Sequence, residues 1–159
     1  MAAAHARAAA ATRQLLGSQI QCVLATVCAD THAPSTHLMA FGLAPDLDRV
    51  FLATEVGTQK ATNMRRSPAV SLLWDDRTGR LEDHAVGTLC TANGNARLLD
   101  AGPECKVAQR AVLAANPNFD EFMSSPTIAL FAVDVAWYDL VVGYGKAVRW
   151  HPSLASSSL

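Results

Sequence analysis

Short extended segments, joined mostly by turn-length loops, limit how this chain can fold more than any other feature. Apolar runs rich in β-branched residues, and stretches of alternating apolar and polar residues, predict strands over residues 20–28, 35–43, 49–54, 69–74, 85–99, 127–140 and 141–150. The loop over residues 44–48 has hairpin length and turn chemistry, and Gly94 predicts a bulge in the fifth strand. A doubly wound fold would need a helix between nearly every pair of strands, and the first half of the chain has one short helix. We therefore expect a mainly β (α+β) fold, an antiparallel barrel or sandwich.

Four other segments have helical patterns. Residues 58–66 begin at a Gly-Thr pair and end before Ser67-Pro68, where proline disfavours continuation of a helix. The segment Pro103–Ala115 has proline at its start, and residues 118–123 predict a second short helix. The alanine-rich residues 1–18 predict an N-terminal helix, although an organellar transit peptide has a similar composition. The expected parts are this helix, a domain over residues 19–150 and a loose tail over residues 151–159.

The charge balance excludes several classes of function. Thirteen Lys and Arg residues against fourteen Asp and Glu residues give a net charge of −1, which is unlike the basic excess of proteins that bind nucleic acids or anionic membranes. Half of the 159 residues are apolar, but no apolar run is long enough to span a bilayer. The cysteines at positions 22, 28, 90 and 105 form no C-x-x-C pair. These features predict one compact core in a cytoplasmic protein that binds neither nucleic acid nor membrane.

Residues 54–60 contain the most informative polar pattern. A strand end is followed by Gly57, by the hydroxyl of Thr58 and by the ammonium group of Lys60, at the point where a helix is expected to begin. The free N–H groups of a first helical turn, the helix dipole, a hydroxyl and an ammonium group can all converge on one anion. The pattern therefore favours a phosphate site. The alternative is an ordinary N-cap at Thr58 and a solvated Lys60.

Two histidines are considered as ligand contacts. His37 lies in the strand over residues 35–43 and is expected opposite the Thr54 segment, which makes it a candidate ligand contact. The alternative is that His37 is a half-exposed strand residue with no ligand. His32 lies an odd number of positions from His37, so an extended chain would place the two on opposite faces, and no zinc site is predicted.

The other chemical groups favour structural roles. The carboxylates at positions 75, 76, 82 and 83 are expected in a solvated loop, and the aromatic residues at positions 137, 138 and 144 in the core or an interface, with stacking on a flat ligand as the alternative. The sequence has no G-x-S-x-G motif, no P-loop and no dinucleotide fingerprint, so these types of hydrolase and nucleotide site are not predicted.

The order and spacing of several segments resemble the pyridoxamine 5′-phosphate oxidase-like family of FMN-binding split barrels over residues 19–149. The similarity is carried by Val23-Leu24-Ala25-Thr26, Ala33-Pro34, Phe51-Leu52-Ala53-Thr54, Gly57-Thr58-Gln59-Lys60-Ala61-Thr62-Asn63-Met64 and Ser67-Pro68-Ala69-Val70-Ser71-Leu72-Leu73. The resemblance implies an antiparallel split β-barrel, with residues 19–150 as the FMN-binding domain.

The resemblance also implies a set of cofactor-binding residues. The FMN phosphate would be held by Thr58, Gln59 and Lys60, with Thr54 at the preceding strand end. The strand that runs along the flavin ring would contribute His37, Leu38, Met39 and Ala40. Gln59 and His37 replace residues that are usually basic in the family, which leaves Lys60 as the main cationic contact. The chain also departs from the oxidase at its end, Trp150-His151-Pro152 followed by a serine-rich tail, which argues against pyridoxamine phosphate as the substrate.

The resulting hypothesis is a homodimeric flavoprotein with FMN at the subunit interface, which carries out a redox reaction on an unidentified small molecule. No side chain stands out as a catalytic acid or base. One alternative is a haem-binding or haem-degrading split barrel, in which His37 or His84 would meet the iron. The stretch Gly143-Tyr144-Gly145-Lys146-Ala147 resembles a glycine, aromatic, glycine element of the haem-utilisation branch of split barrels. Deazaflavin in place of FMN, and a non-catalytic binding or stress-response protein, are further alternatives.

Overall fold

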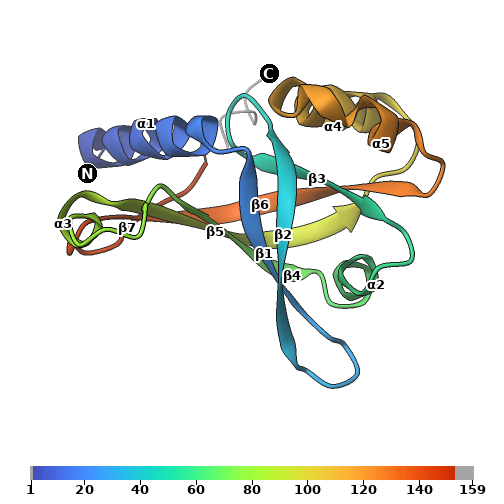
Figure 1. The fold of residues 1–159 in the computed structure, drawn as a ribbon, viewed down its shortest axis with the longest axis horizontal. Helices are drawn as coiled ribbons and strands as arrows, with labels where there is room; N and C mark the ends of the chain where they lie inside the picture. Colours follow the sequence, from blue (N-terminus) through green and yellow to red (C-terminus); the bar gives the residue numbers. More distant parts are fainter. Residues whose placement is uncertain (1, 153–159) are drawn as a thin grey trace.

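The computed structural model describes residues 2–152 of the chain. The strands are β1 (Gln21–Val27), β2 (Pro34–Leu43), β3 (Arg49–Glu55), β4 (Ala69–Asp75), β5 (Thr88–Leu98), β6 (Ile128–Val142) and β7 (Val148–Trp150). The helices are α1 (Ala2–Ser18), α2 (Gln59–Arg66), α3 (Asp83–Val86), α4 (Pro103–Ala115), the 3-10 turn η1 (Pro117–Phe119) and α5 (Asp120–Ser124). Figure 1 shows how these helices surround the strands.

The strands form one antiparallel sheet that closes on itself. Their order is β3-β2-β1-β4-β5-β6-β7, and β3 also pairs with β6, from Arg49 opposite Asp134 to Glu55 opposite Ile128. Within the described residues, six strands therefore make a closed barrel, and β7 lies outside it against the end of β6. The predicted antiparallel split barrel, mainly β with flanking helices, is confirmed.

Alternating side chains fill the interior of the barrel. In β4 the buried positions are Val70, Leu72 and Trp74, the pattern expected of a strand with one buried face. Leu15 and Leu16 of α1 join the same apolar cluster. The N-terminal helix predicted from the alanine-rich segment is therefore confirmed, and it belongs to the core of the domain.

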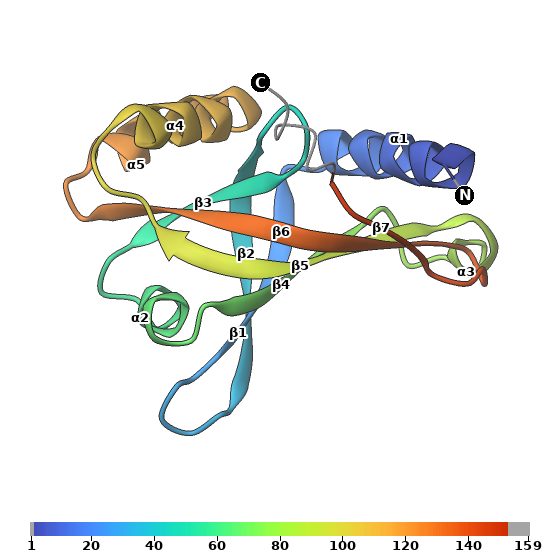
Figure 2. The same cartoon turned by 180° about the vertical axis from the view of Figure 1, so that it is seen from behind.

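Strands β3 and β6 are buried on both faces. Val50 and Leu52 of β3 belong to the barrel core, while Phe51 belongs to a second cluster with Ala108 and Val112 of α4. Figure 2 shows α4 and α5 lying together over one side of the barrel. This double burial explains why these two strands are almost continuously apolar in sequence.

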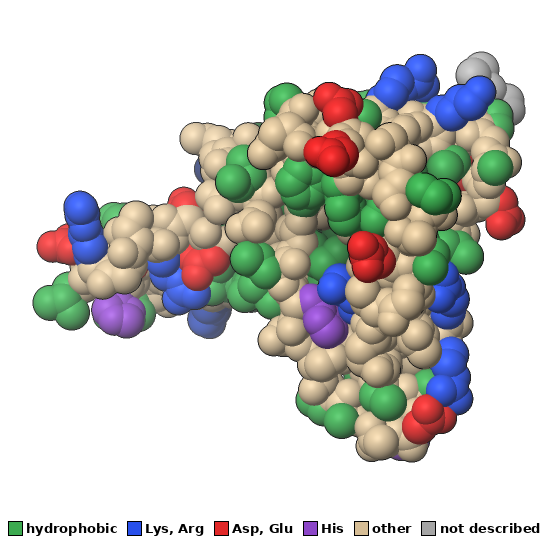
Figure 3. Space-filling view, turned by 45° about the vertical axis from the view of Figure 1, so that its right-hand side comes forward, with side chains coloured by type: hydrophobic (Ala, Val, Ile, Leu, Met, Phe, Trp, Pro, Cys, Tyr) green, Lys and Arg blue, Asp and Glu red, His purple; other side chains and the backbone are tan. Residues whose placement is uncertain are grey.

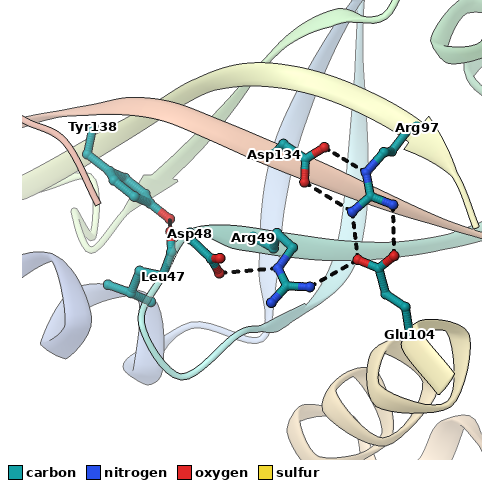
Figure 4. A network of polar contacts seen from close by, with 7 residues as sticks. All are labelled: Leu47, Asp48, Arg49, Arg97, Glu104, Asp134 and Tyr138. Carbon is teal, nitrogen blue, oxygen red and sulfur yellow. Dashed lines mark hydrogen bonds and ion pairs between the residues drawn. The ribbon is translucent and has the colours of Figure 1, made fainter. Parts of the chain in front are cut away.

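An ion-pair network fastens the start of α4 to the barrel (Figure 4). Arg97 of β5 donates to Glu104 at 2.6 and 2.9 Å and to Asp134 of β6 at 2.7 Å. Arg49 of β3 donates to the same Glu104 carboxylate at 3.0 Å. The hydrogen bonds from Arg97, and next those from Arg49, lower the pKa of Glu104 to about 2. The network thus connects three neighbouring strands to one helix.

Two predicted strand boundaries are wrong at the end of the barrel that carries α3 and β7. Residues 85 and 86 were expected in a strand, but they belong to α3, and β5 begins at Thr88. The predicted division between residues 140 and 141 falls inside β6, because Val141 and Val142 continue to pair with Leu89 and Thr88. The last strand is therefore β7 alone, after a turn at Gly143 with a φ of 54°. The bulge predicted at Gly94 is confirmed by a register shift between Asn93 and Gly94.

The three aromatic residues near the chain end occupy different environments. Tyr138 is fully buried and stacks on Trp150, with 4.7 Å between ring centroids. Trp137 lies beneath an arginine side chain of β7. Tyr144 is exposed and stacks on His84 at 5.7 Å. The predicted core role is therefore confirmed for Tyr138, and Tyr144 does not share it. Of the predicted tail, residues 153–159 lie outside the described residues.

Gly42 marks the closest approach of β2 to α4. A Cβ atom at Gly42 would lie 2.5 Å from the backbone carbon of Ala111 and 2.5 Å from the backbone nitrogen of Val112. Gly42→Ala should therefore lower the free energy of unfolding by about 1–3 kcal/mol, measured by chemical denaturation. Gly17→Ala is the control, because a Cβ there meets nothing within 4 Å. Equal stability of Gly42→Ala and the wild type would contradict this contact.

The pKa of Glu104 predicts a dependence of stability on pH. The folded-state pKa lies below the ordinary value of 4.5, so the stabilisation by Glu104 is complete above pH 4.5 and is lost as the pH falls towards about 2. Glu104→Gln should therefore lower the urea midpoint at pH 7, and its difference from the wild type should narrow between pH 4.5 and 2. The control is Glu82→Gln, at an exposed position before α3. A difference that does not change with pH would contradict this role of Glu104.

Candidate functional site

A cavity of about 640 Å³ opens on one face of the barrel, between the middle of β2, the end of β3, the start of α2 and the η1–α5 segment. Figure 3 shows this face, with hydrophobic side chains inside the hollow and charged side chains around it. The lining residues are Gln21, Leu38, Met39, Ala40, Ala53, Thr54, Glu55, Thr58, Lys60, Asn118, Phe119, Glu121 and Phe122.

Most of the residues that the sequence singles out for a cofactor lie around this cavity. Of the predicted set, the cavity is lined by Leu38, Met39, Ala40, Thr54, Thr58 and Lys60, whereas His37 and Gln59 do not line it. The fold therefore brings together residues of β2, β3 and α2 that are separated in the sequence.

Thr58 forms the N-cap of α2. Its Oγ1 accepts a hydrogen bond from the N–H of Ala61 at 3.4 Å and donates to the carbonyl oxygen of Glu55 at 2.9 Å. It also lies 3.1 Å from the Oγ1 of the buried Thr54. The capping role considered for Thr58 is therefore confirmed, and the same hydroxyl lies at the cavity wall.

Lys60 and the first turn of α2 give the cavity a positive end. The N–H groups of Gln59 and Lys60 have no acceptor within the helix, because a helix leaves its first N–H groups unpaired. The helix dipole adds partial positive charge at the same place. Within residues 2–152, the Lys60 ammonium group makes no ion pair. These groups can accept an anion without first breaking an existing ion pair.

The edge of β2 at the cavity has no strand partner in the described sheet. β2 pairs with β1 from Pro34 to Ala40, but with β3 only from Phe41 to Leu43. Along residues 34–40, the edge that faces away from β1 therefore presents backbone N–H and C=O groups that no neighbouring strand satisfies. Leu38, Met39 and Ala40 are the part of this edge at the cavity. A flat ligand with polar edges could hydrogen-bond to them.

His37 and Gln59 belong to a polar chain that joins α2 to the β1–β2 hairpin. The side chain of Gln59 donates to Asn63, and Asn63 donates to Thr26 of β1 at 2.9 Å. The hydroxyl of Thr26 lies 3.3 Å from Nε2 of His37, and the hydroxyl of Ser35 lies 3.2 Å from the same nitrogen. Thr26 and Asn63 are fully buried. This chain holds α2, and with it Lys60, in a fixed position on the hairpin.

The predicted placement of His37 opposite the Thr54 segment is wrong. The pairing of β2 with β3 covers only Phe41 to Leu43 of β2, beside the loop that connects the two strands. His37 therefore lies beyond this pairing and pairs with Leu24 of β1, while Thr54 pairs with Ala129 of β6. The charge of Lys60 nevertheless acts on His37. Burial, and next the positive charge of Lys60, lower the pKa of His37. The ring is thereby favoured in its neutral form.

Sequence reasoning missed the opposite wall of the cavity. Asn118, Phe119, Glu121 and Phe122, from η1 and α5, form this wall. The sequence predicts a short helix over residues 118–123, but no local pattern relates that helix to residues 54–60. The sheet brings the two segments together, because the N–H of Val56, after β3, donates to the carbonyl oxygen of Thr127, which directly precedes β6.

The other candidate groups lie elsewhere. The described cysteines are free, and burial raises the pKa of Cys22 and of Cys90 to about 12, which makes both thiols poor nucleophiles at neutral pH. The acidic loop is solvated, as expected: Asp75 pairs with Arg77, and Asp83 accepts backbone N–H groups of the same loop. His84 lines a separate hollow beside this loop.

Within residues 2–152, no group of three or more His, Cys, Asp or Glu side chains is arranged to hold a metal ion. None of the described helices is both long enough and apolar enough to cross a membrane.

Solved structures with a similar fold carry several different functional names. The heme binding protein from Mycobacterium smegmatis has a TM-score of 0.77 and 21% identity over 96% of this chain and 58% of its own chain. Campylobacter jejuni ChuZ has a TM-score of 0.74 and 12% identity over 89% of this chain and 58% of its own. General Stress Protein 26 from Bacillus anthracis str. Sterne has a TM-score of 0.63 and 17% identity over 86% of this chain and 94% of its own chain. At these identities the likeness is one of fold, and the present chain spans just over half the length of the first two proteins.

No curated protein matches the sequence of this chain. The family model described as pyridoxamine 5′-phosphate oxidase matches residues 8–141, a range that includes β1 to α5 and nearly all of β6. With most of its length matched in this way, the chain belongs to the pyridoxamine 5′-phosphate oxidase family.

Proposed function

We propose that this protein binds FMN in the cavity between β2, β3, α2 and α5, as a homodimer, and uses it in a redox reaction on a small molecule. The observation that carries the proposal is the convergence on one cavity of Lys60 and the α2 N-terminus with the unpaired edge of β2. Membership of the pyridoxamine 5′-phosphate oxidase family supports the same cofactor class.

The chemistry of the cavity fits FMN. Its volume of about 640 Å³ lies within the range of about 300–1,000 Å³ typical of cofactor pockets. Lys60 and the first-turn N–H groups of α2 would hold the phosphate, and the hydroxyl of Thr58 would join them by turning its proton from the carbonyl oxygen of Glu55 to a phosphate oxygen. The backbone of Leu38 to Ala40 would contact the polar edge of the ring, and the apolar side chains of the cavity would cover its face. Bound FMN would supply the electron transfer, and the chain would supply binding, orientation and electrostatics.

Exposed apolar side chains support a homodimer. Leu38 lines the cavity and is 64% exposed, and Ile20, next to the lining residue Gln21, is 69% exposed. Phe122 is 37% exposed on the opposite wall. Large apolar side chains in such positions are typical of surfaces that a partner covers. A second copy seated here would close the cavity over the cofactor and build part of the substrate site.

Haem is the second candidate cofactor, favoured by the likeness to a heme binding protein. The candidate iron ligand is then His37, which precedes the lining residue Leu38 in β2 and lies within hydrogen-bond distance of Thr26 and Ser35. His84 is the weaker candidate for an iron ligand, because it lies beside the acidic loop and stacks on Tyr144.

The test is an absorbance spectrum of the purified protein, alone and titrated separately with FMN and hemin, together with sedimentation analysis of its mass. We expect a perturbed flavin spectrum with saturable binding and a dimer mass. A Soret band on addition of hemin, with no flavin binding, would identify haem and not FMN as the cofactor. Binding of neither FMN nor hemin would contradict both candidates. A monomer at every concentration, with FMN bound, would contradict the shared site.

Lys60→Ala should weaken FMN binding strongly. A charge-assisted hydrogen bond is worth about 1.5–3 kcal/mol, so the dissociation constant should rise about 10- to 150-fold, measured by quenching of flavin fluorescence. Lys106→Ala is the matched control, because Lys106 is exposed on α4 and does not line the cavity. Equal affinity of Lys60→Ala and the wild type would remove Lys60 from the phosphate site.

Thr58→Ala should affect both stability and binding. Loss of the N-cap should lower the free energy of unfolding of the FMN-free protein by about 1 kcal/mol, and loss of the hydroxyl should also weaken FMN binding. Thr58→Ser retains the hydroxyl and should restore both properties. A fall in stability with unchanged FMN affinity would assign Thr58 the capping role alone.

A further inference from the structure

The two walls of the cavity carry opposite charge. The α2 wall presents Lys60 and a helix N-terminus, and the α5 wall presents the carboxylate of Glu121. In Figures 1 and 2, α2 and α5 lie on opposite sides of the end of β3. Glu55, at that strand end, also lines the cavity, on its β3 side. Among the described lining residues of the α5 wall, Glu121 is the one that carries a charge.

The Glu121 carboxylate is free to meet a ligand. Within residues 2–152, this carboxylate makes no ion pair and accepts no side-chain hydrogen bond, since the contact with Ser124 uses the backbone carbonyl of Glu121. Glu121 lies in the first turn of α5, where the helix dipole favours an acidic residue. That interaction leaves the oxygens of the carboxylate without a hydrogen-bond partner.

Aromatic surface lies beside this carboxylate. Phe119 and Phe122 both line the cavity and form an edge-to-face pair, with 5.5 Å between ring centroids and an interplanar angle of 60°. Phe119 is half-buried and Phe122 is more exposed. Two phenyl rings next to a free carboxylate make a surface that favours a flat ligand with a positive charge or N–H donors.

We propose that the α5 wall is the substrate side of the site and that it selects flat aromatic compounds that are cationic or neutral, and rejects anionic ones. The assignment as a substrate side rests on the proposed FMN function, which places the cofactor phosphate at the α2 wall. A second phosphate or carboxylate at the α5 wall would meet the Glu121 charge with no nearby cation, whereas an ammonium or protonated ring nitrogen would be attracted by it.

The charge selection is tested with two probes of similar shape and opposite charge, benzylamine and benzoate. Their dissociation constants are measured by ligand-observed NMR at low salt and pH 7 on the FMN-loaded protein, in which the FMN phosphate fills the anion site at α2. If the protein binds no FMN, they are measured on the protein as purified. We expect benzylamine to bind at least about fivefold more tightly than benzoate, the ratio expected for one unit charge at contact distance in a solvated site. The ratio should shrink in 0.5 M salt, because salt screens exposed charges.

Variants separate the charge of Glu121 from the shape of the site. Glu121→Gln should bring the ratio of the two dissociation constants close to one, and Phe122→Ala should weaken both probes with little change in their ratio. Glu82→Gln, at an exposed position that does not line the cavity, should leave the ratio unchanged. Equal binding of the two probes by the wild type, or an unchanged ratio in Glu121→Gln, would overturn the proposal.

The outcomes also separate this inference from the proposed function. FMN binding with no preference between the probes would overturn the charge selection alone. A probe preference that depends on Glu121, in a protein that binds no FMN, would support the charge selection and overturn the flavin function.

Discussion

The pairing of β3 with β6 is the constraint on which the rest of the structure depends. It closes the sheet into a barrel and leaves both strands buried on two faces, by the barrel core inside and by α4 outside. The ion pairs of Glu104 with Arg97 and Arg49 hold α4 against this closed region. The same pairing brings the end of β3, where α2 begins, next to the segment that leads from α5 into β6. The cavity is therefore a consequence of closing the barrel.

Closure also explains why β2 has a free edge at this place. Strands of a barrel cross at an angle with a shifted register, so one strand cannot pair with both neighbours along its whole length. β2 pairs with β1 along its first part and with β3 only from Phe41 to Leu43. Of the remaining residues of β2, Leu38, Met39 and Ala40 line the same cavity as Thr58 and Lys60 at the start of α2. A site formed from backbone groups and one lysine can hold a cofactor without a catalytic side chain, and the chemistry then depends on the cofactor.

If the protein binds FMN as proposed, the arrangement of charge would give the two sides of the cavity different tasks. The α2 side is held by the polar chain from Gln59 through the buried Asn63 and Thr26 to His37, which would suit a permanently bound anion. The α5 side carries exposed aromatic surface and Glu121, on a helix of five residues. A short helix joined by a 3-10 turn is the part of such a site that can vary between relatives while the barrel stays the same.

Local sequence patterns determined the strands, the helix starts and the residues around the start of α2, because periodicity, capping and turn chemistry act over a few neighbouring positions. The Gly94 bulge and the Thr58 cap were predictable for this reason. Only the tertiary structure decided that His37 pairs with Leu24 and lies outside the short pairing of β2 with β3, that β6 continues through Val142, and that Glu121 lines the same cavity as Lys60. Those features depend on which distant strands pair and in which register, and pairing over long separations leaves no local signal in the sequence.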